Sequence, residues 1–221
     1  MSRTEVRPQP VVVAGETLGA AWLAVADTIL TRGRRATYDG QGILEVPLLT
    51  VTVDAPDPDD ALIAELGDPV WLAWMHDNFT KPDRVAELGD AASYATRLLD
   101  YEGTGRDQVQ WAIDRIAADP TARSATITTF QPLSDTAYIP CVSMLDFWAP
   151  EGRLDLVVYA HGLDFGKKAY GNLVELAHLQ ERVAAAVDAP VGRLVIHVKT
   201  AHVYEPEWAL MAELSAAAPR S

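Results

Sequence analysis

The sequence predicts an α+β fold with a mixed β-sheet, and three observations lead to this prediction. Apolar residues at helical spacing fill most of the first half of the chain. Runs typical of β-strands fill most of the second half, and one long helical pattern lies between the last two of them. Such a helix is expected to be buried against a sheet.

The predicted helices follow from apolar spacing. The segment 19–30 predicts the first helix, and an acidic, proline-rich stretch over 54–60 predicts a solvated connector whose aspartates cap helices. Residues 61–78 predict one or two short helices, because a Gly-Asp-Pro sequence interrupts the pattern. Two further helices are expected over residues 91–100 and 107–118.

The predicted strands are runs rich in β-branched or alternating apolar residues. The first covers 43–53 and follows a turn at Gly40 and Gly42, with Pro47 marking an edge or a bulge. The long buried helix is expected to begin at Asn172. Four further strands are expected over residues 124–130, 141–148, 154–160 and 193–199.

Composition narrows the class of protein. The chain has 221 residues, 49% hydrophobic and 22% charged, which predicts one domain over 1–221 with frayed ends at about 1–12 and 214–221. A formal net charge of -13 argues against nucleic-acid binding. No apolar run is long enough to span a membrane or to form a signal peptide, so a cytoplasmic protein is expected. No Cys and His spacing is typical of a metal site.

Cys141 is the only cysteine of the chain, and two interpretations of it stay open on the residues alone. A lone cysteine is most often a small buried apolar residue. Its position at the start of a predicted strand, after a polar loop, instead favours the access that a nucleophile needs. A reactive thiolate also needs a nearby cation, and His161, at the end of another predicted strand, is the candidate.

An ordered set of motifs resembles the thymidylate synthase family, in the form of its short archaeal-type members. The segments around Tyr94 and AWMHDNF at 73–79 fit the same family. The motifs that carry the resemblance are, in chain order, Asp119-Pro120, Arg123, Pro140-Cys141, Tyr159, Asp164, Asn172, His202 and Tyr204. The resemblance implies a thymidylate synthase-like mixed sheet packed against a long buried helix and surrounding helices.

The resemblance also implies a chemistry. In this family, which is related to pyrimidine nucleotide hydroxymethylases, a cysteine thiolate adds to C6 of a pyrimidine. C5 then takes a one-carbon unit from 5,10-methylenetetrahydrofolate. Cys141 is the implied nucleophile, acting on a uracil-type nucleotide or nucleoside to transfer a methyl or hydroxymethyl group. A homodimer is implied, with Arg123 reaching the neighbouring site.

Further roles follow by resemblance only. Asn172 matches the amide that reads the base, since an amide offers both a donor and an acceptor. Asp164 matches a carboxylate that contacts the folate pterin and supports the base. Glu65 is the implied general base. Substrate contacts are implied for Tyr94, His202 and Tyr204, the last two at the ribose hydroxyl; as alternating residues these two also fit a plain strand face.

The residues that depart from the family pattern are mainly those that bind the phosphate of the nucleotide in the family. Three positions that carry arginine in the family are Tyr38, Ser124 and His161 here, and only Arg123 remains. Each lost charge-assisted hydrogen bond weakens phosphate binding by about 1.5–3 kcal/mol, so we expect a specialised nucleoside metabolism. A protonated His161 would replace part of the arginine that contacts the catalytic sulfur. The segment after Asn78 lacks the tryptophans that the family places against folate.

Two other functions remain open at this stage. In the first, thiol attack at C6 labilises a C5 substituent without folate, which gives exchange, dehalogenation or decarboxylation. In the second, the chain is a non-catalytic nucleoside-binding protein that keeps the scaffold without turnover.

Overall fold

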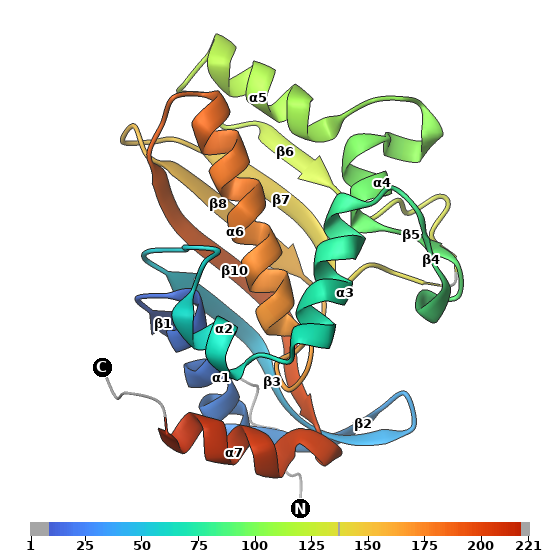
Figure 1. The fold of residues 1–221 in the computed structure, drawn as a ribbon, viewed down its shortest axis with the longest axis vertical. Helices are drawn as coiled ribbons and strands as arrows, with labels where there is room; N and C mark the ends of the chain where they lie inside the picture. The colour runs from blue at the N-terminus through green and yellow to red at the C-terminus, as the bar shows by residue number, and fades with distance from the viewer. Residues whose placement is uncertain (1–8, 137, 218–221) are drawn as a thin grey trace, which may run out of the picture.

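One mixed sheet organises the structure. The computed structural model describes residues 9–136 and 138–217. Its strands lie in the order β1-β3-β10-β8-β7-β6, with β2 paired to β3 and β9 paired to β10 (Figure 1). The strands are β1 (Val11–Gly15), β2 (Arg34–Tyr38), β3 (Gln41–Val53), β6 (Ala125–Thr128), β7 (Val142–Trp148), β8 (Leu154–Ala160), β9 (Leu163–Asp164) and β10 (Val191–Tyr204). A separate short ribbon pairs β4 (Arg84–Val85) with β5 (Ala91–Ala92).

The sheet contains both parallel and antiparallel pairs, and β1 pairs parallel with β3. The central strand β10 pairs antiparallel with β3 and parallel with β8, while β6, β7 and β8 form an antiparallel meander. Pro47 lies in β3 between the part that pairs with β2 and the part that pairs with β1. Because proline has no N–H to donate, it fits the edge position that the sequence predicts.

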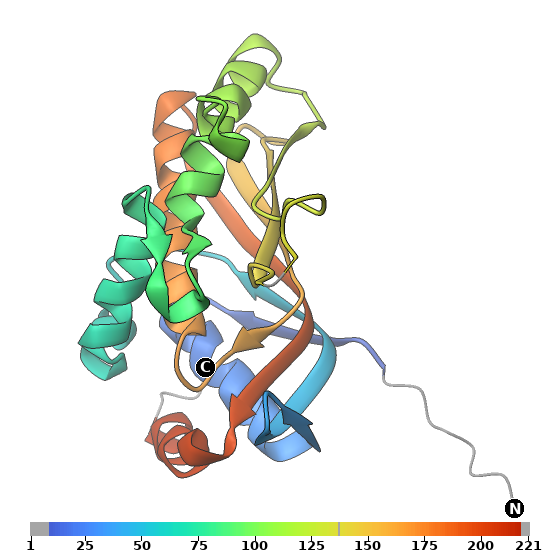
Figure 2. The same cartoon turned by 90° about the vertical axis from the view of Figure 1, so that its right-hand side faces the viewer.

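The helices are α1 (Leu18–Arg32), α2 (Ala61–Leu66), α3 (Pro69–Thr80), α4 (Tyr94–Leu99), α5 (Gln108–Ala118), α6 (Ala169–Ala186) and α7 (Trp208–Ala217). Single 3-10 turns cover Ala86–Leu88, Tyr101–Gly103 and Glu205–Glu207. Helices α3, α5 and α6 lie on the same side of the sheet (Figure 2). None of the helices in the described ranges has both the length and the apolar character that a membrane crossing requires.

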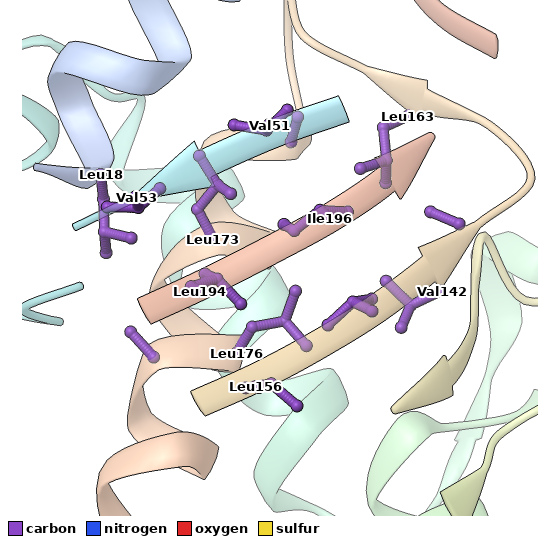
Figure 3. Close-up of a cluster of buried hydrophobic side chains, with 14 of the residues drawn as sticks. Leu18, Val51, Val53, Val142, Leu156, Leu163, Leu173, Leu176, Leu194 and Ile196 are labelled. Atoms are coloured by element: carbon purple, nitrogen blue, oxygen red, sulfur yellow. The ribbon is translucent and has the colours of Figure 1, made fainter. Parts of the chain in front are cut away.

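Helix α6 forms the centre of the core. Its Leu173 and Leu176 are fully buried and point towards the strands that carry Leu194, Ile196 and Leu156 (Figure 3). Each of these strands turns alternate residues towards the helix, so apolar side chains interdigitate in one layer. The mixed α+β class predicted from the sequence is confirmed.

Most element boundaries agree with the sequence pattern, and the ends of the chain are the main correction. β1 begins at Val11, inside the segment expected to be frayed, because its residues pair in parallel with Leu49–Val53 of β3. Helix α7 continues to Ala217, since its Met211 is buried and the Trp208 indole donates to the Val203 carbonyl oxygen at 3.0 Å. The rest of the predicted frayed ends, 1–8 and 218–221, lies outside the described residues.

Candidate active site

Strands β2, β3, β9 and β10 and helices α3, α4 and α6 contribute residues to a cavity of about 630 Å³. This volume is typical of sites for small organic ligands. Seven of the nine residues singled out in the sequence line it, namely Tyr94, Cys141, His161, Asp164, Asn172, His202 and Tyr204. The fold therefore brings residues that are far apart in the sequence to one site.

Cys141 lies directly before β7, on the cavity wall. Its carbonyl oxygen accepts a hydrogen bond of 3.0 Å from the His161 N–H, which joins the start of β7 to the end of β8. Burial raises the pKa of the Cys141 thiol, the positive charge of Lys168 opposes this increase, and the negative charge of Asp164 adds to it. The thiol therefore depends on neighbouring charges for its ionisation.

Tyr94, the first residue of α4, places its hydroxyl next to the cysteine. The hydroxyl oxygen accepts a 3.0 Å hydrogen bond from the Val142 N–H, and the ring stacks on Phe79 with centroids 4.4 Å apart. The Asn78 side-chain oxygen accepts the Tyr94 N–H at 2.9 Å. Burial raises the pKa of Tyr94 well above its usual value, so the phenol keeps its proton and can donate it as a hydrogen bond into the cavity.

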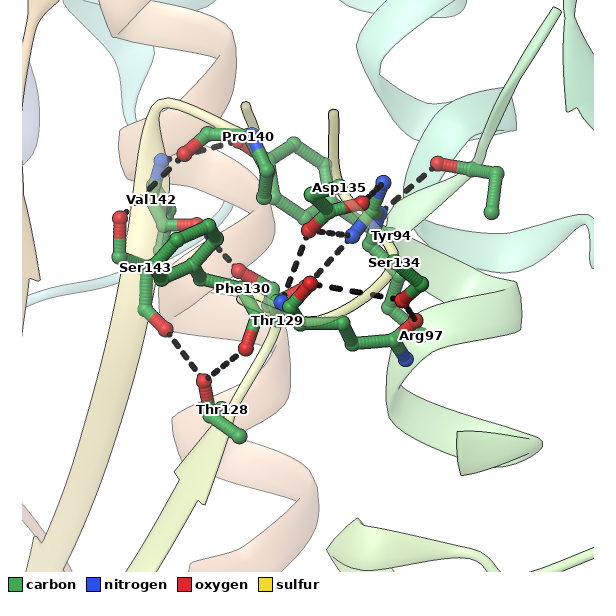
Figure 4. Close-up of polar contacts among 12 residues, drawn as sticks. Tyr94, Arg97, Thr128, Thr129, Phe130, Ser134, Asp135, Pro140, Val142 and Ser143 are labelled. Atoms are coloured by element: carbon green, nitrogen blue, oxygen red, sulfur yellow. Dashed lines mark hydrogen bonds and ion pairs between the residues drawn. The ribbon is translucent and has the colours of Figure 1, made fainter. Parts of the chain in front are cut away.

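A buried ion pair fixes the loop that leads to Cys141. Arg97 binds both carboxylate oxygens of Asp135, at 2.7 and 2.8 Å, and also donates to the Thr129 carbonyl oxygen at 2.8 Å (Figure 4). Asp135 in turn accepts the Gln131 N–H at 2.8 Å. Both charged side chains are buried, so the pair connects α4 to the polar loop between β6 and β7. Sequence reasoning did not single out Asp135.

Asn172 presents an unused acceptor to the cavity. Its side-chain NH₂ donates to the Lys168 carbonyl oxygen at 3.1 Å, one turn earlier in α6. Its amide oxygen is buried and has no hydrogen-bond partner within the described ranges. Because an unsatisfied buried acceptor costs free energy, it is a strong recognition group for a ligand donor.

Asp164, in the two-residue strand β9, carries a carboxyl group that titrates near neutrality. Burial raises its pKa to about 6, the Gly166 N–H at 3.0 Å opposes that shift, and the negative charge of Glu207 adds to it. Such a group accepts or donates a proton close to physiological pH.

His202 and Tyr204 stand two residues apart on β10, on the cavity face, while Val203 between them is fully buried. The ring centroids of His202 lie 5.1 Å from Tyr204 and 5.8 Å from Tyr38, both in edge contacts. Burial lowers the pKa of His202 and raises the pKa of Tyr204 to about 12. Both side chains are therefore neutral hydrogen-bonding groups near pH 7.

The surroundings of His161 favour its neutral form. Burial lowers the pKa of its imidazole, and the positive charge of Lys199 lowers it further. Its Nδ1 contacts the Ser143 hydroxyl at 3.2 Å. The imidazole lines the cavity but is mainly neutral at pH 7, so it does not replace an arginine.

Glu65 and Arg123 lie outside the cavity. Glu65 is exposed in the last turn of α2, whose buried residue is Ile63, so the prediction that Glu65 is the general base is wrong for this geometry. Arg123 is exposed in the loop before β6. Its predicted role across a dimer stays a prediction.

Three further residues line the cavity that are not among the nine site residues singled out in the sequence. Trp74 lines the cavity from α3, where the spacing of Trp71, Trp74 and Asn78 gives one helix face. In this chain Trp71 and Trp74 therefore precede Asn78, whereas the tryptophans of the family pattern follow it. Lys168 and Lys199 also line the cavity. No group of three or more His, Cys, Asp or Glu in the described part of the chain is arranged to hold a metal ion.

The fold and the cavity define an α+β protein whose single cysteine lines a cavity of the size that small organic ligands occupy. Residues 58–221 match the family model for thymidylate synthase. The chain belongs to the thymidylate synthase family. Membership supports a pyrimidine C5 methyltransferase-like activity. Members of the family bind pyrimidine nucleotides, generally form dimers and typically use methylenetetrahydrofolate.

Similar proteins come mainly from archaea. A provisionally named thymidylate synthase of Methanothermobacter marburgensis is 28% identical over 216 residues, covering 87% of this chain and 92% of the relative. One from Methanothermobacter thermautotrophicus is 31% identical over 200 residues, covering 83% and 89%. Thymidylate synthase 1/2 of Encephalitozoon cuniculi is 31% identical over 115 residues, covering 51% and 39%.

Proposed function

We propose that this protein transfers a methyl or hydroxymethyl group to C5 of a uracil-type nucleotide or nucleoside through a covalent adduct with Cys141. One observation carries the proposal: the only thiol of the chain and the unpartnered amide oxygen of Asn172 line the same cavity. A nucleophile and a base-reading group are thereby available to one bound pyrimidine.

The proposed chemistry begins at C6 of the pyrimidine ring. The Cys141 thiolate forms a bond to C6, and the electrons of the C5–C6 double bond move onto C5 and the O4 enolate. C5 then bonds to the one-carbon unit, the C5 hydrogen leaves as a proton, and the carrier nitrogen departs. A hydroxymethyl product would then require addition of water to the one-carbon unit, whereas a methyl product would require a hydride, which a tetrahydrofolate carrier would supply on oxidation to dihydrofolate. Departure of the thiolate restores the double bond, so covalent addition divides one difficult substitution into easier steps.

Asn172 favours uracil over cytosine. Its NH₂ group is held by the Lys168 carbonyl oxygen, so the amide oxygen faces the ligand. Uracil has a donor at N3, which this oxygen accepts, whereas N3 of cytosine is itself an acceptor and repels it. His202 and Tyr204 are proposed to bind sugar hydroxyls, since both are neutral donors or acceptors on the cavity wall.

The cavity also fits the one-carbon carrier of the family. Trp74, Leu88 and Ile139 supply apolar surface for a flat heterocycle, and Asp164 supplies a carboxyl group for hydrogen bonds to it. We propose that these residues hold 5,10-methylenetetrahydrofolate, which supplies the one-carbon unit when bound. A reaction of this kind agrees with the cytoplasmic location expected from the sequence.

Covalent trapping tests the proposal. A 5-fluoropyrimidine nucleoside or nucleotide, given with methylenetetrahydrofolate, blocks loss of the C5 substituent and leaves the adduct on Cys141. Intact mass spectrometry is expected to show one bound ligand per chain, and Cys141→Ser is expected to show none. Binding without an adduct would instead identify a non-catalytic nucleoside-binding protein.

Tritium release distinguishes one-carbon transfer from the remaining alternative, which is folate-independent exchange at C5. With C5-tritiated deoxyuridine or its monophosphate, release is expected only when methylenetetrahydrofolate is present. Release at the same rate without the carrier would contradict one-carbon transfer and identify folate-independent C5 exchange.

A further inference from the structure

We propose that Lys168 is the cation that stabilises the Cys141 thiolate, a function that the sequence had given to His161. The proposal rests on the proposed function only in taking Cys141 as the nucleophile. Lys168 would influence the reaction through the Cys141 sulfur, which makes it a positioning residue.

Two tryptophans hold the ammonium group of Lys168. Its Nζ lies 5.0 Å from the ring centroid of Trp71 and 4.9 Å from that of Trp74. Cation–π contacts of this length restrain a flexible lysine without neutralising its charge. Lys168 is half-buried and lines the cavity together with Cys141 and Trp74.

The charge of Lys168 remains available to the cavity. Across the described ranges, no carboxylate lies within ion-pair distance of its Nζ. The neighbouring Lys167 differs, because its Nζ lies 3.9 Å from the Glu207 carboxylate. Lys167 also lies outside the cavity wall and therefore offers a matched control.

The backbone of Lys168 is tied to both ligand-facing residues of this wall. Its N–H donates to the Asp164 carbonyl oxygen at 3.1 Å. Its own carbonyl oxygen accepts the N–H and the side-chain NH₂ of Asn172, each at 3.1 Å. A rigid backbone and a restrained side chain together fix the ammonium group relative to the thiol and the base site.

The other groups around Cys141 supply no positive charge to the thiol. Lys199 also lines the cavity, but its side chain is exposed and its charge acts on His161. His161 is mainly neutral, because burial and Lys199 lower its pKa. Asp164, which faces the thiol from β9, is an acid and opposes the thiolate. The remaining groups that interact with the thiol are phenols, whose pKa values burial raises: Tyr38 of β2, Tyr94 of α4, Tyr138 of the preceding loop and Tyr204 of β10. Of the two lysines on the cavity wall, Lys168 is the half-buried one, and its charge opposes the effect of burial on the thiol.

Alkylation of the single cysteine tests this directly, with no substrate present. The rate of iodoacetamide modification is followed by intact mass from about pH 6 to about pH 10, for the full chain and its variants. Lys168→Met is expected to slow alkylation by about three- to tenfold near pH 8 and to move the profile to higher pH. Lys168→Arg is expected to recover most of the rate, and Lys167→Met to stay within about twofold of the parent.

The shape of the profile distinguishes electrostatics from altered structure. If Lys168 acts by charge, the parent and Lys168→Met reach similar rates at the alkaline end, where both thiols are ionised. A parallel loss at every pH, or an unchanged profile, would overturn the proposal. A larger effect from His161→Gln than from Lys168→Met would overturn it too.

This experiment can fail independently of the proposed function. A Lys168-dependent profile with no 5-fluoropyrimidine adduct would uphold the thiolate contact and reject pyrimidine chemistry. A 5-fluoropyrimidine adduct, together with an alkylation profile that Lys168→Met leaves unchanged, would support pyrimidine chemistry and reject the contact between Lys168 and the thiolate.

Discussion

Asn172 offers its oxygen to the cavity because its nitrogen is already bound, and base preference should follow from that orientation. In Asn172→Asp, the carboxyl group can accept a hydrogen bond from the amino group of cytosine and, when protonated, can donate one to N3. We expect the ratio of uridine to cytidine affinity to fall by about tenfold or more, since a mismatched buried polar group costs about 1–3 kcal/mol. Isothermal titration with both nucleosides measures the ratio. Asn172→Ala, the control, should weaken both ligands, and an unchanged ratio in Asn172→Asp would refute the assignment.

Asp164 should leave a signature in the pH dependence of stability. Its pKa of about 6 in the folded chain lies above the unfolded value near 3.9. Between these pH values the folded state binds more protons, so the free energy of unfolding decreases as pH rises and stays lowered above about pH 6. Asp164→Asn is expected to lack this decrease, which is on the order of 1–3 kcal/mol, and urea titrations from about pH 4 to about pH 7 measure it. Equal slopes for the two proteins would contradict a raised pKa.

The site residues show what sequence reasoning can and cannot find. Cys141, Asn172, His202 and Tyr204 were found because chemical type and order along the chain survive in a one-dimensional pattern. Glu65 was misplaced, since its position on α2 faces solvent, and a motif carries no information on helix rotation. Lys168 carries no special spacing of its own, and its contacts with tryptophans of another helix exist only in three dimensions.

At the scale of elements, the contact between α4 and the β6–β7 loop should be essential for folding. Arg97→Met leaves Asp135 buried without its partner, and removal of one member of a buried pair costs about 3–5 kcal/mol. We expect urea denaturation to show a loss of this size. The control is Lys81→Gln, which removes an exposed pair with Asp77 and should cost less than about 1 kcal/mol. Similar losses of unfolding free energy in the two variants would show that the buried pair contributes no more to stability than the exposed pair.

Long elements were predictable and short ones were not. The helix α6 and the strand β10 follow from apolar periodicity, because each buries one regular face. β9 has two residues and β2 is largely exposed, so neither carries a burial pattern from which it could be recognised. β10 extends beyond the predicted strand to Tyr204, since pairing with β3 continues through Tyr204 and Ile43.

At the scale of the whole molecule, Arg123 tests the proposed homodimer. It lies outside the cavity of its own chain, as required of a residue that serves a second copy. Arg123→Gln and Cys141→Ser are each expected to be nearly inactive alone. Mixed after reversible unfolding, they should regain about a quarter of parental activity, because half of the dimers are mixed and each has one intact site. Mixtures that stay inactive would show that Arg123 does not act across an interface.

The long strand β10 has a consequence for motion. It pairs with β3 from Leu194 to Tyr204 along one edge, and along the other it pairs with β8 as far as Val198 and with β9 at Ala201 and His202. We expect the amide protons of this doubly paired part, which includes His202, to exchange slowly with solvent, because exchange requires opening of the sheet. The cavity wall at His202 is thus preorganised, and little conformational entropy would be lost there on binding.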